Sequence, residues 1–439
     1  MASVNRRQFL AGGTLSLSGG ALLASETLAQ PSERVRVGCV GVGGRAGALV
    51  RACAALREVE LVTLCDLDPG RLAQAAEAVE KIQGRRPRTE SDFRRLVEDR
   101  GLDALVVGTP DHWHALPTIL GCMAGKDVYV EKPDAHNIVE GRTMVAAARK
   151  HNRIVQLGTQ ARTSDRTRTA MEFIRTGALG KCRFAKAWES SKQGSIGRPP
   201  DGDPPPGIDY DFWLGSAPKR PFNPRRFHGN WRWFFDYGTG DLGNDGVHRL
   251  DVARWALSTA AEAQGEPALG LPSAVSAAGG KFYFDDLQEW PDTMQVTYEY
   301  PGKLLTYEMR VWAPYDYHGE SEGAVVYGEK GYIVIGNSRW RAYERGEKLL
   351  AEGNGGDTTT EHLRNFFACV KSRARPNADL ETVGHISSVL CHAGNVAWRA
   401  GKRLTLDPKT ERFDDRSANE YRSRPVYRKP WVLPEFPGV

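Results

Sequence analysis

The chain has 439 residues, of which 41% are hydrophobic and 26% are charged, and its formal net charge is +5 at pH 7. This length allows two domains of ordinary size, and the composition is that of a globular protein. So small a charge excess argues against nucleic acid or a membrane surface as the partner.

Residues 1–29 are predicted to be a twin-arginine export signal. Asn5-Arg-Arg-Gln-Phe-Leu10 is followed by a stretch rich in Gly, Ala and Leu, and Thr27-Leu-Ala29 is a candidate cleavage site. The apolar part is too weakly hydrophobic for a membrane span. The sequence therefore predicts a periplasmic protein; the alternative is a disordered N-terminus with a chance pair of arginines.

The seven cysteines are scattered, without Cys-x-x-Cys spacing, and most lie in apolar runs. Such a set is typical of buried thiols and predicts neither a disulfide framework nor a zinc site. His112 and His114 have no carboxylate at metal-ligand spacing, so no metal is expected.

Residues 33–158 are predicted to form a dinucleotide-binding domain. An apolar strand from Val35 breaks into Gly41-Val-Gly-Gly-Arg-Ala-Gly47, and a helical period follows from 47 to 57. Gly41, Gly43 and Ala46 fit the pattern G-x-G-x-x-G/A, in which small residues let the backbone approach a pyrophosphate at a helix N-terminus.

A second apolar strand, residues 61–65, ends at Asp66. A carboxylate at this place accepts both adenosine ribose hydroxyls and repels a 2′-phosphate, which predicts NAD as the cofactor in preference to NADP. The alternative is that Asp66 is a solvated loop residue.

The remaining part of this domain alternates helices and strands. Helical periods at 72–79, 93–97 and 139–150 are interleaved with apolar strands at 104–107, 127–130 and 154–157. This alternation predicts a parallel, doubly wound sheet. Gly108-Thr-Pro-Asp-His-Trp-His114 and Glu131-Lys-Pro133 each follow a strand, at the edge where such sheets bind ligands.

Residues 159–405 are predicted to form a second, α+β domain, and residues 406–439 an extended arm laid on the surface or on a neighbour. A Gly- and Pro-rich segment, 193–211, cannot be helical. The expected helices are 165–177, 243–257, 361–373 and 383–400, and the expected strands are 182–189, 274–284, 293–300, 304–312, 324–327 and 331–335.

Taken together, the motifs resemble the glucose–fructose oxidoreductase/inositol dehydrogenase/MocA family. They are the glycine turn, Thr-Pro-x-x-x-His, Gly-Lys-Asp-Val-Tyr-Val-Glu-Lys-Pro133 and Gly-Asn-Asp-Gly-Val-His248, and the match covers roughly residues 34–405. The resemblance implies a second domain built on a large, mostly antiparallel sheet, whose open face carries the substrate and often the subunit contact. A homo-oligomer, dimer or tetramer, is expected.

The resemblance also implies a cofactor-binding set. It places Lys132 beside the nicotinamide ribose, with Glu131 to orient or neutralise it, and the Thr-Pro-x-x-x-His turn against the cofactor. The alternative for Lys132 is a surface ion pair. The complete predicted set is Gly41, Gly43, Gly44, Arg45, Asp66, Thr109, Pro110, His112, His114, Glu131, Lys132 and Gln160.

Asp245, His248 and Arg249 form one polar stripe on an otherwise apolar helix. By the resemblance, His248 is the candidate general base that removes an alcohol proton, and Asp245 binds the adjacent hydroxyl. The predicted catalytic set is therefore Lys132, His248 and Asp245. The alternative for His248 is a core histidine satisfied by backbone groups.

Further substrate contacts are expected from Arg162 and from an aromatic segment. Trp231, Trp233, Phe235 and Tyr237 share parity, which would place them on one side of an extended chain. Aromatic faces beside polar side chains suit a sugar ring. The alternatives are solvation for Arg162 and packing for the aromatic residues. The predicted substrate set is Arg162, Trp231, Trp233, Tyr237, Asp245 and Arg249.

The predicted function is hydride transfer between a sugar or polyol hydroxyl and tightly bound NAD. A redox-neutral NAD-dependent glycosidase of the same family is the alternative, and a non-catalytic NAD sensor is the third. Unlike periplasmic glucose–fructose oxidoreductases, which retain NADP with a long N-terminal arm, this chain has only Gln30–Arg34 before the first strand. The C-terminal arm is therefore the candidate for retaining the cofactor.

Overall fold

The computed structural model describes residues 34–190 and 192–439. The predicted export signal, residues 1–29, lies outside the described residues. No helix in the described part of the chain has the length and apolarity that a membrane span requires.

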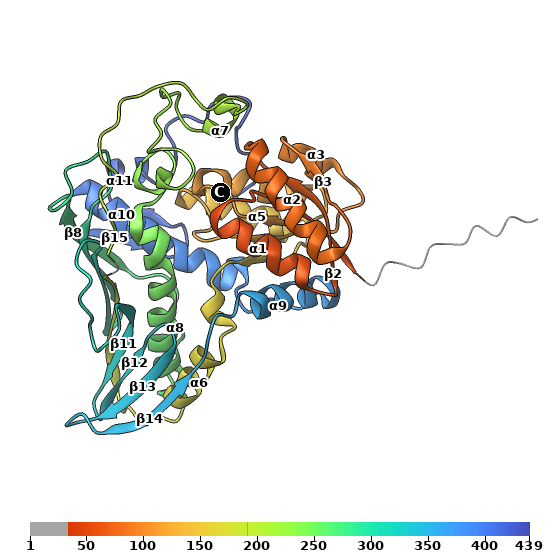
Figure 1. Ribbon diagram of the computed structural model, residues 1–439. Helices are drawn as coiled ribbons and strands as arrows, with labels where there is room; N and C mark the ends of the chain where they lie inside the picture. Colours follow the sequence, from red (N-terminus) through yellow and green to blue (C-terminus); the bar gives the residue numbers. More distant parts are fainter. Residues whose placement is uncertain (1–33, 191) are drawn as a thin grey trace, which may run out of the picture. The chain divides into compact units, whose positions relative to one another are not determined.

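The first sheet has six parallel strands in the order β3-β2-β1-β4-β5-β6 (Figure 1). This order confirms the doubly wound parallel sheet, with its ligand edge at the strands' carboxyl ends. The strands are β1 (Val35–Val40), β2 (Val59–Cys65), β3 (Arg88–Glu90), β4 (Ala104–Val107), β5 (Asp127–Val130) and β6 (Val155–Leu157). The helices between them are α1 (Gly44–Ala55), α2 (Pro69–Gln83), α3 (Phe93–Glu98), α4 (Ala115–Met123) and α5 (Ile138–Lys150).

One helix that packs beside the first sheet comes from the C-terminal part of the chain. α9 (Thr359–Ser372) lies beside α1 (Figure 1), and its Leu363, Phe366 and Phe367 are buried in the same apolar cluster as β1 and β2. The assignment of this helix to the second domain is therefore wrong. Its apolar face is complementary to the first sheet, which a helical period alone cannot reveal.

The second sheet has ten strands in the order β14-β13-β12-β11-β7-β10-β9-β8-β15-β16, and all its pairs are antiparallel except β7 with β10. This confirms the mostly antiparallel second sheet. The strands are β7 (Cys182–Glu189), β8 (Ala274–Gly280), β9 (Thr293–Tyr300), β10 (Lys303–Arg310), β11 (Glu322–Gly328), β12 (Gly331–Ile335), β13 (Arg339–Glu344), β14 (Leu349–Asn354), β15 (Leu404–Asp407) and β16 (Arg412–Phe413).

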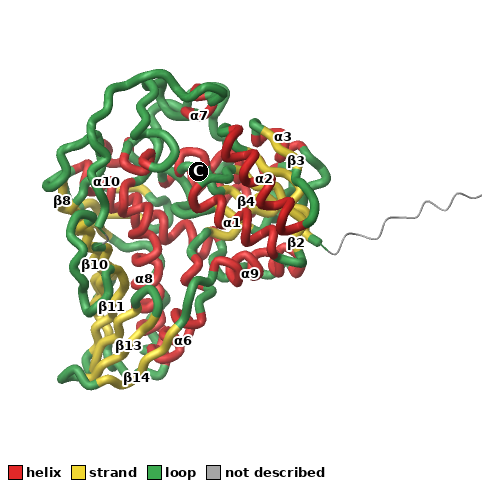
Figure 2. Tube along the Cα trace, viewed as in Figure 1, coloured by secondary structure: helices red, strands yellow, loops and turns green. Residues whose placement is uncertain are grey.

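Helices cover one face of this sheet, as Figure 2 shows for α6 and α8. The long helices are α6 (Asp165–Arg175), α8 (Val247–Ala263) and α10 (His385–Ala400). The short ones are α7 (Tyr210–Leu214) and α11 (Arg416–Glu420), the 3₁₀ turns η1 (Asp111–Trp113), η2 (Gln160–Arg162) and η3 (Asn230–Trp233), and the π-type turns η4 (Leu242–Gly246) and η5 (Leu380–Gly384).

The strand predicted at 274–284 ends four residues early. The backbone N–H groups of residues 282–284 donate to the carboxylate of Asp292, at 2.9–3.1 Å, instead of to a neighbouring strand. The polar strands β13 and β14 were not predicted, because only cross-strand pairing defines them.

The predicted C-terminal arm, residues 406–439, is not extended throughout, because the end of β15, β16 and α11 occupy its first part. After α11 it runs without regular structure and packs on its own chain. Trp431 stacks on Phe212, with ring centroids 4.6 Å apart and an interplanar angle of 7°. The Arg94 guanidinium lies 4.9 Å from the centre of the Trp431 ring. The arm thus covers residues that stand next to the dinucleotide edge of the first sheet.

Candidate active site

The glycine turn after β1 has the shape that a dinucleotide requires. Gly41 has φ +88°, and a Cβ atom there would lie 2.9 Å from the carbonyl oxygen of Gly108, so only glycine fits. α1 begins at Gly44, three residues earlier than predicted, and no side chain caps it. Its first N–H groups are left for an anion, so the turn fits a pyrophosphate.

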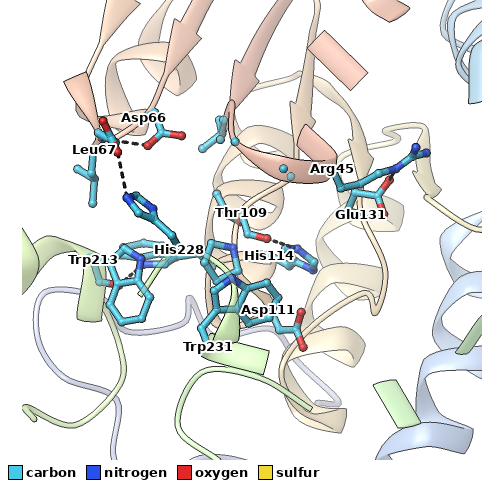
Figure 3. Close-up of a pocket in the computed structure, with 18 of the residues that line it drawn as sticks. Arg45, Asp66, Leu67, Thr109, Asp111, His114, Glu131, Trp213, His228 and Trp231 are labelled. Atoms are coloured by element: carbon cyan, nitrogen blue, oxygen red, sulfur yellow. Dashed lines mark hydrogen bonds and ion pairs between the residues drawn. The ribbon is translucent and has the colours of Figure 1, made fainter. Parts of the chain in front are cut away.

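The glycine turn and the start of α1 line a pocket whose volume is about 1200 Å³ when the part open to solvent is included. Figure 3 shows Asp66 and His228 at one end, which we call the mouth, and Arg45 and Glu131 at the other, which we call the inner end. Residues of the second domain close the pocket from the opposite side: Phe212, Trp213, Phe227, His228, Trp231, Arg232 and Asn244. Of these, the sequence predicted only Trp231.

Asp66 is fixed at the mouth of the pocket by backbone groups. Its two carboxylate oxygens accept from the N–H of Val42 at 2.9 Å and of Asp68 at 3.0 Å. Asp68 in turn accepts from two N–H groups at the start of α2, and Nε2 of His228 lies 3.0 Å from its Oδ2. The second domain therefore contacts this end of the pocket directly.

Glu131 contributes to the other end differently from the prediction. Its Oε1 lies 3.1 Å from Nε of Arg45 and 3.3 Å from Nε2 of Gln160, while only the backbone N–H of Lys132 reaches its Oε2. The expectation that Glu131 pairs with the Lys132 ammonium is wrong, because Arg45 occupies the carboxylate.

The Lys132 ammonium is held by the turn η4. Its Nζ donates to the backbone oxygen of Asn244 at 2.7 Å and to Oδ1 of the same residue at 3.1 Å. Nδ2 of Asn244 donates to Oδ2 of Asp245 at 2.9 Å. Lys132 and Asp245 are thus joined through Asn244, a role that sequence reasoning missed although the residue stands within the motif.

His248 lies on the first turn of α8, three residues beyond Asp245. Burial, followed by the positive charge of Lys132, lowers the pKa of His248 well below its usual value. The imidazole is therefore neutral at pH 7 and free to accept a proton. A neutral imidazole can accept a proton, and among the described residues no hydrogen bond supports the alternative of a backbone-satisfied core histidine.

The two histidines after β4 have different environments. His114 lines the pocket, with its ring nitrogens 2.6 Å from the oxygen of Pro133 and 2.8 Å from that of Thr109. His112 is buried behind the wall, with Nε2 2.9 Å from the oxygen of Trp213. Burial lowers the pKa of His112 to about 3. The prediction that His112 binds the cofactor is therefore wrong, because its side chain does not line the pocket.

Five polar residues predicted near the substrate or cofactor are not among the residues that line the pocket: Gln160, Arg162, Asp245, His248 and Arg249. Asp245 and His248 lie next to the lining residue Asn244 on η4 and at the start of α8; the other three are used elsewhere. Arg162 makes two hydrogen bonds, 2.7 and 2.8 Å, with the buried carboxylate of Asp251. Arg249 pairs with Glu322. Gln160 donates to the hydroxyl of Tyr129 at 3.0 Å. The structure uses these side chains inside the fold, so the predicted pocket contacts are corrected for all three.

The aromatic segment is not extended, because η3 winds Asn230–Trp233 into a 3₁₀ turn. The parity argument is therefore wrong. Trp231 lines the pocket, whereas Trp233 and Tyr237 are 3% and 0% exposed in the core. The centre of the Tyr237 ring lies 5.0 Å from that of Trp213, so Tyr237 packs behind a residue that lines the pocket.

The seven cysteines are buried and unpaired, and burial raises the pKa of Cys65 and Cys122. Within residues 34–190 and 192–439, no group of three or more His, Cys, Asp or Glu side chains is arranged to hold a metal ion.

A doubly wound sheet with a glycine turn and a ribose-side carboxylate, closed by a second antiparallel domain, defines a two-domain NAD-binding protein. Sequence comparison gives the family. Residues 35–159 match the oxidoreductase family's NAD-binding Rossmann fold, and residues 186–299 match its C-terminal alpha/beta domain. The chain therefore belongs to the glucose–fructose oxidoreductase/inositol dehydrogenase/MocA oxidoreductase family.

Curated relatives match over a limited region. A glycosyl hydrolase family 109 protein of Stenotrophomonas maltophilia is 29% identical over 137 residues, 30% of each chain. An alpha-N-acetylgalactosaminidase of Shewanella oneidensis is 26% identical over 36% of each chain. The chain thus spans about a third of the length of these relatives.

Solved structures share the fold over most of the chain. An aldose-aldose oxidoreductase from Caulobacter crescentus complexed with glycerol has a TM-score of 0.65 and 20% identity, over 85% of this chain and 100% of that one. Levoglucosan dehydrogenase in complex with NADH and levoglucosan has a TM-score of 0.64 and 18% identity, over 85% and 99% of the two chains.

Proposed function

We propose that the protein is an NAD-dependent oxidoreductase that moves a hydride between a CH–OH carbon of a sugar or polyol and tightly bound NAD. The observation that carries the proposal is the junction of Lys132 with the Asn244–Asp245 turn at the inner end of the pocket. It brings a cation from the first domain to the carboxylate and the neutral imidazole of the second.

Each group has its own role in the proposed reaction. The glycine turn binds the pyrophosphate, and Asp66 accepts the ribose hydroxyls. His248 takes the proton of the substrate hydroxyl on its free ring nitrogen, while Lys132 and Asp245 orient the oxygens beside it. When bound, NAD supplies the hydride acceptor.

Tight retention of NAD is supported by the closed side of the pocket. Besides the contact between His228 and Asp68, the indole N–H of Trp113 donates to the backbone oxygen of Trp213 at 2.8 Å. Trp431 of the C-terminal arm stacks behind Phe212, one of the lining residues. We expect these contacts to slow the release of a bound nucleotide.

The predicted twin-arginine signal supports a periplasmic location for a protein that folds around its nucleotide before export. Because a trapped nucleotide cannot be exchanged there, each turnover must return it to its starting state. A second sugar can do this by accepting the hydride.

A redox-neutral glycosidase is the second candidate, and the names of the curated relatives favour it. Oxidation, elimination of the glycosidic substituent, addition of water and reduction would give net hydrolysis. Incubation with p-nitrophenyl glycosides and with sugar pairs, without added NAD, separates the two. We expect turnover only with sugar pairs, giving an oxidised and a reduced product. Repeated release of nitrophenol with no redox product would replace the first proposal by the second.

A further inference from the structure

An arginine of the pocket wall, Arg232, has no ionic partner in the part of the chain that the structure describes. It belongs to the turn η3, next to Trp231, and both side chains line the pocket, as Figure 3 shows for Trp231. Among the described residues, no carboxylate oxygen lies within 4.0 Å of its nitrogens, and its buried Nε has no hydrogen-bond partner. A buried donor without an acceptor is costly, so we expect a ligand to supply one.

The carboxylates that line the pocket have other partners. Asp66, Asp68 and Glu131 accept from the groups described above. Asp111 accepts at its Oδ2 from the hydroxyl of Thr239, at 2.7 Å. Each of these lining carboxylates is therefore bound to a donor other than Arg232.

The cations that line the pocket fall into two groups. Arg45 and Arg71 each lie near a lining carboxylate, with N–O distances of 3.1 and 3.7 Å. The Lys132 ammonium instead donates to two neutral oxygens. Burial raises the pKa of Asp111, while the positive charges of Lys132 and Arg232, among others, lower it. Both cations therefore lie near this carboxyl group, and neither has an ion pair to neutralise it.

Asp241, which does not line the pocket, is the other carboxyl group near Arg232. Its Oδ1 accepts from Nε2 of Gln193 at 3.1 Å. Burial, and after it the charge of Asp245, raises the pKa of Asp241 to about 8, so most of this group is protonated at pH 7. Asp241 therefore leaves most of the charge of Arg232 without compensation.

The residue beside this arginine suits a sugar ring. The guanidinium carbon of Arg232 lies 5.8 Å from the centre of the Trp231 ring. The turn that carries both is closely packed, because a Cβ atom at Gly238 would lie 2.4 Å from the Cα atom of Arg232. An indole face packs on the C–H groups of a sugar, and a charged group next to it can bind a substituent of the same ring.

We propose that the substrate is a sugar that carries an acidic group, a carboxylate or a phosphate, and that Arg232 binds this group while Trp231 packs on the ring. The inference rests on the proposed sugar site and names its substrate class. A guanidinium donates two parallel hydrogen bonds to either acid, which a neutral hydroxyl cannot accept in the same way. Arg232 is thus the residue that distinguishes an acidic sugar from its neutral counterpart.

Calorimetric titration of the full chain with its bound nucleotide tests the proposal at neutral pH. The ligands are two series with the same ring: D-glucose, D-glucuronate and D-glucose 6-phosphate, and D-galactose, D-galacturonate and D-galactose 6-phosphate. In at least one series we expect an acidic member to bind at least about tenfold more tightly than the neutral sugar, the usual contribution of a charge-assisted hydrogen bond. The member that gains shows whether the acid is a carboxylate or a phosphate. No such preference in either series overturns the proposal.

Variants of Arg232 assign the preference to this side chain. Arg232→Gln should abolish it, and Arg232→Lys, which keeps the charge but not the fork of donors, should retain part of it. Arg225→Gln is the matched control, since Arg225 is an exposed arginine of the same segment that does not line the pocket, and it should keep the full preference. An undiminished preference in Arg232→Gln contradicts the assignment.

Nucleotide content separates this role from cofactor binding. NAD released on denaturation of Arg232→Gln should equal that of the wild type, and a clear loss would assign Arg232 to the nucleotide and overturn the proposal. The titrations do not depend on turnover. Formation of NADH from neutral and acidic sugars that bind equally would overturn only the acidic substrate, whereas a preference without any NADH would support it and count against hydride transfer.

Discussion

The two ends of the pocket are built in different ways. At the mouth, backbone groups do most of the work: Gly41 fits against Gly108, and Asp66 is fixed by N–H groups of residues near it in the chain. At the inner end, Lys132 binds Asn244, 112 residues away, and all the proposed reactive groups are side chains. We therefore expect changes at the mouth to alter nucleotide binding, and changes at the inner end to alter turnover with the nucleotide still bound.

The largest expected effect is at the inner end. His248→Ala and Lys132→Ala should each reduce turnover about 10²–10⁴-fold, the usual contribution of a positioned acid or base. Bound NAD, measured after denaturation, should stay at the wild-type level. Lys126→Ala is not a matched control, because that ammonium supports two backbone oxygens, at 2.6 and 3.1 Å. Lys181→Ala, an exposed lysine directly before β7, serves instead. Near-normal turnover in either inner-end variant removes that residue from the mechanism.

The buried residue His385 should make the free energy of unfolding depend on pH. His385 lies between Asp134, two residues after Lys132, and Glu411, at 2.6 and 3.1 Å. Burial works against the charged imidazole, but the two carboxylates outweigh it and raise the pKa of His385 to about 9 from the usual 6.5.

Because the folded pKa is raised, the stabilisation is fully present below pH 6.5 and is lost as the pH rises through 9. It amounts to at most about 3 kcal/mol. The free energy of unfolding should therefore fall between pH 6.5 and 9 in the wild type, with a smaller fall in His385→Gln. Parallel curves for the two proteins would show that this histidine does not carry the effect.

A smaller effect is expected at the mouth. Asp66→Ala should weaken NAD binding about tenfold or somewhat more, because hydrogen bonds to a charged group contribute roughly 1.5–3 kcal/mol. Nucleotide content after gel filtration measures it, with turnover at saturating NAD little changed. Release of NADP(H) in place of NAD(H) from the wild type would contradict the role given to Asp66.

The smallest effect concerns the closed side. His228→Ala should speed the exchange of bound NAD for labelled NAD only a few-fold, since a partly exposed contact with Asp68 contributes about 0.2–1 kcal/mol. Arg198→Ala is the matched control, because it removes an exposed ion pair with Asp285. An exchange rate equal to that of the control would show that the contact between His228 and Asp68 does not slow NAD release, so that only the aromatic contacts could do so.

The same contrast explains what the sequence could reveal. The glycine turn, Asp66 and the alternation of strands and helices are local patterns, and the sequence placed them to within a few residues. The partner of Lys132, the burial of His112, the use of Arg162 inside the fold and the position of α9 depend on segments that are distant in the chain. Periodicity contains no information on such contacts, so these features required the three-dimensional structure.

The central claim is that NAD enclosed in this pocket takes hydride from a sugar under the control of His248. The most direct measurement mixes the purified protein, with no NAD added, with one sugar at a time and follows the near-ultraviolet absorbance of NADH. The account predicts a rise equal to one NADH per bound nucleotide for some sugar in the wild type, and a rate at least about 10² lower in His248→Ala. A rise of equal rate in the variant, or no rise with any sugar that binds, would contradict it.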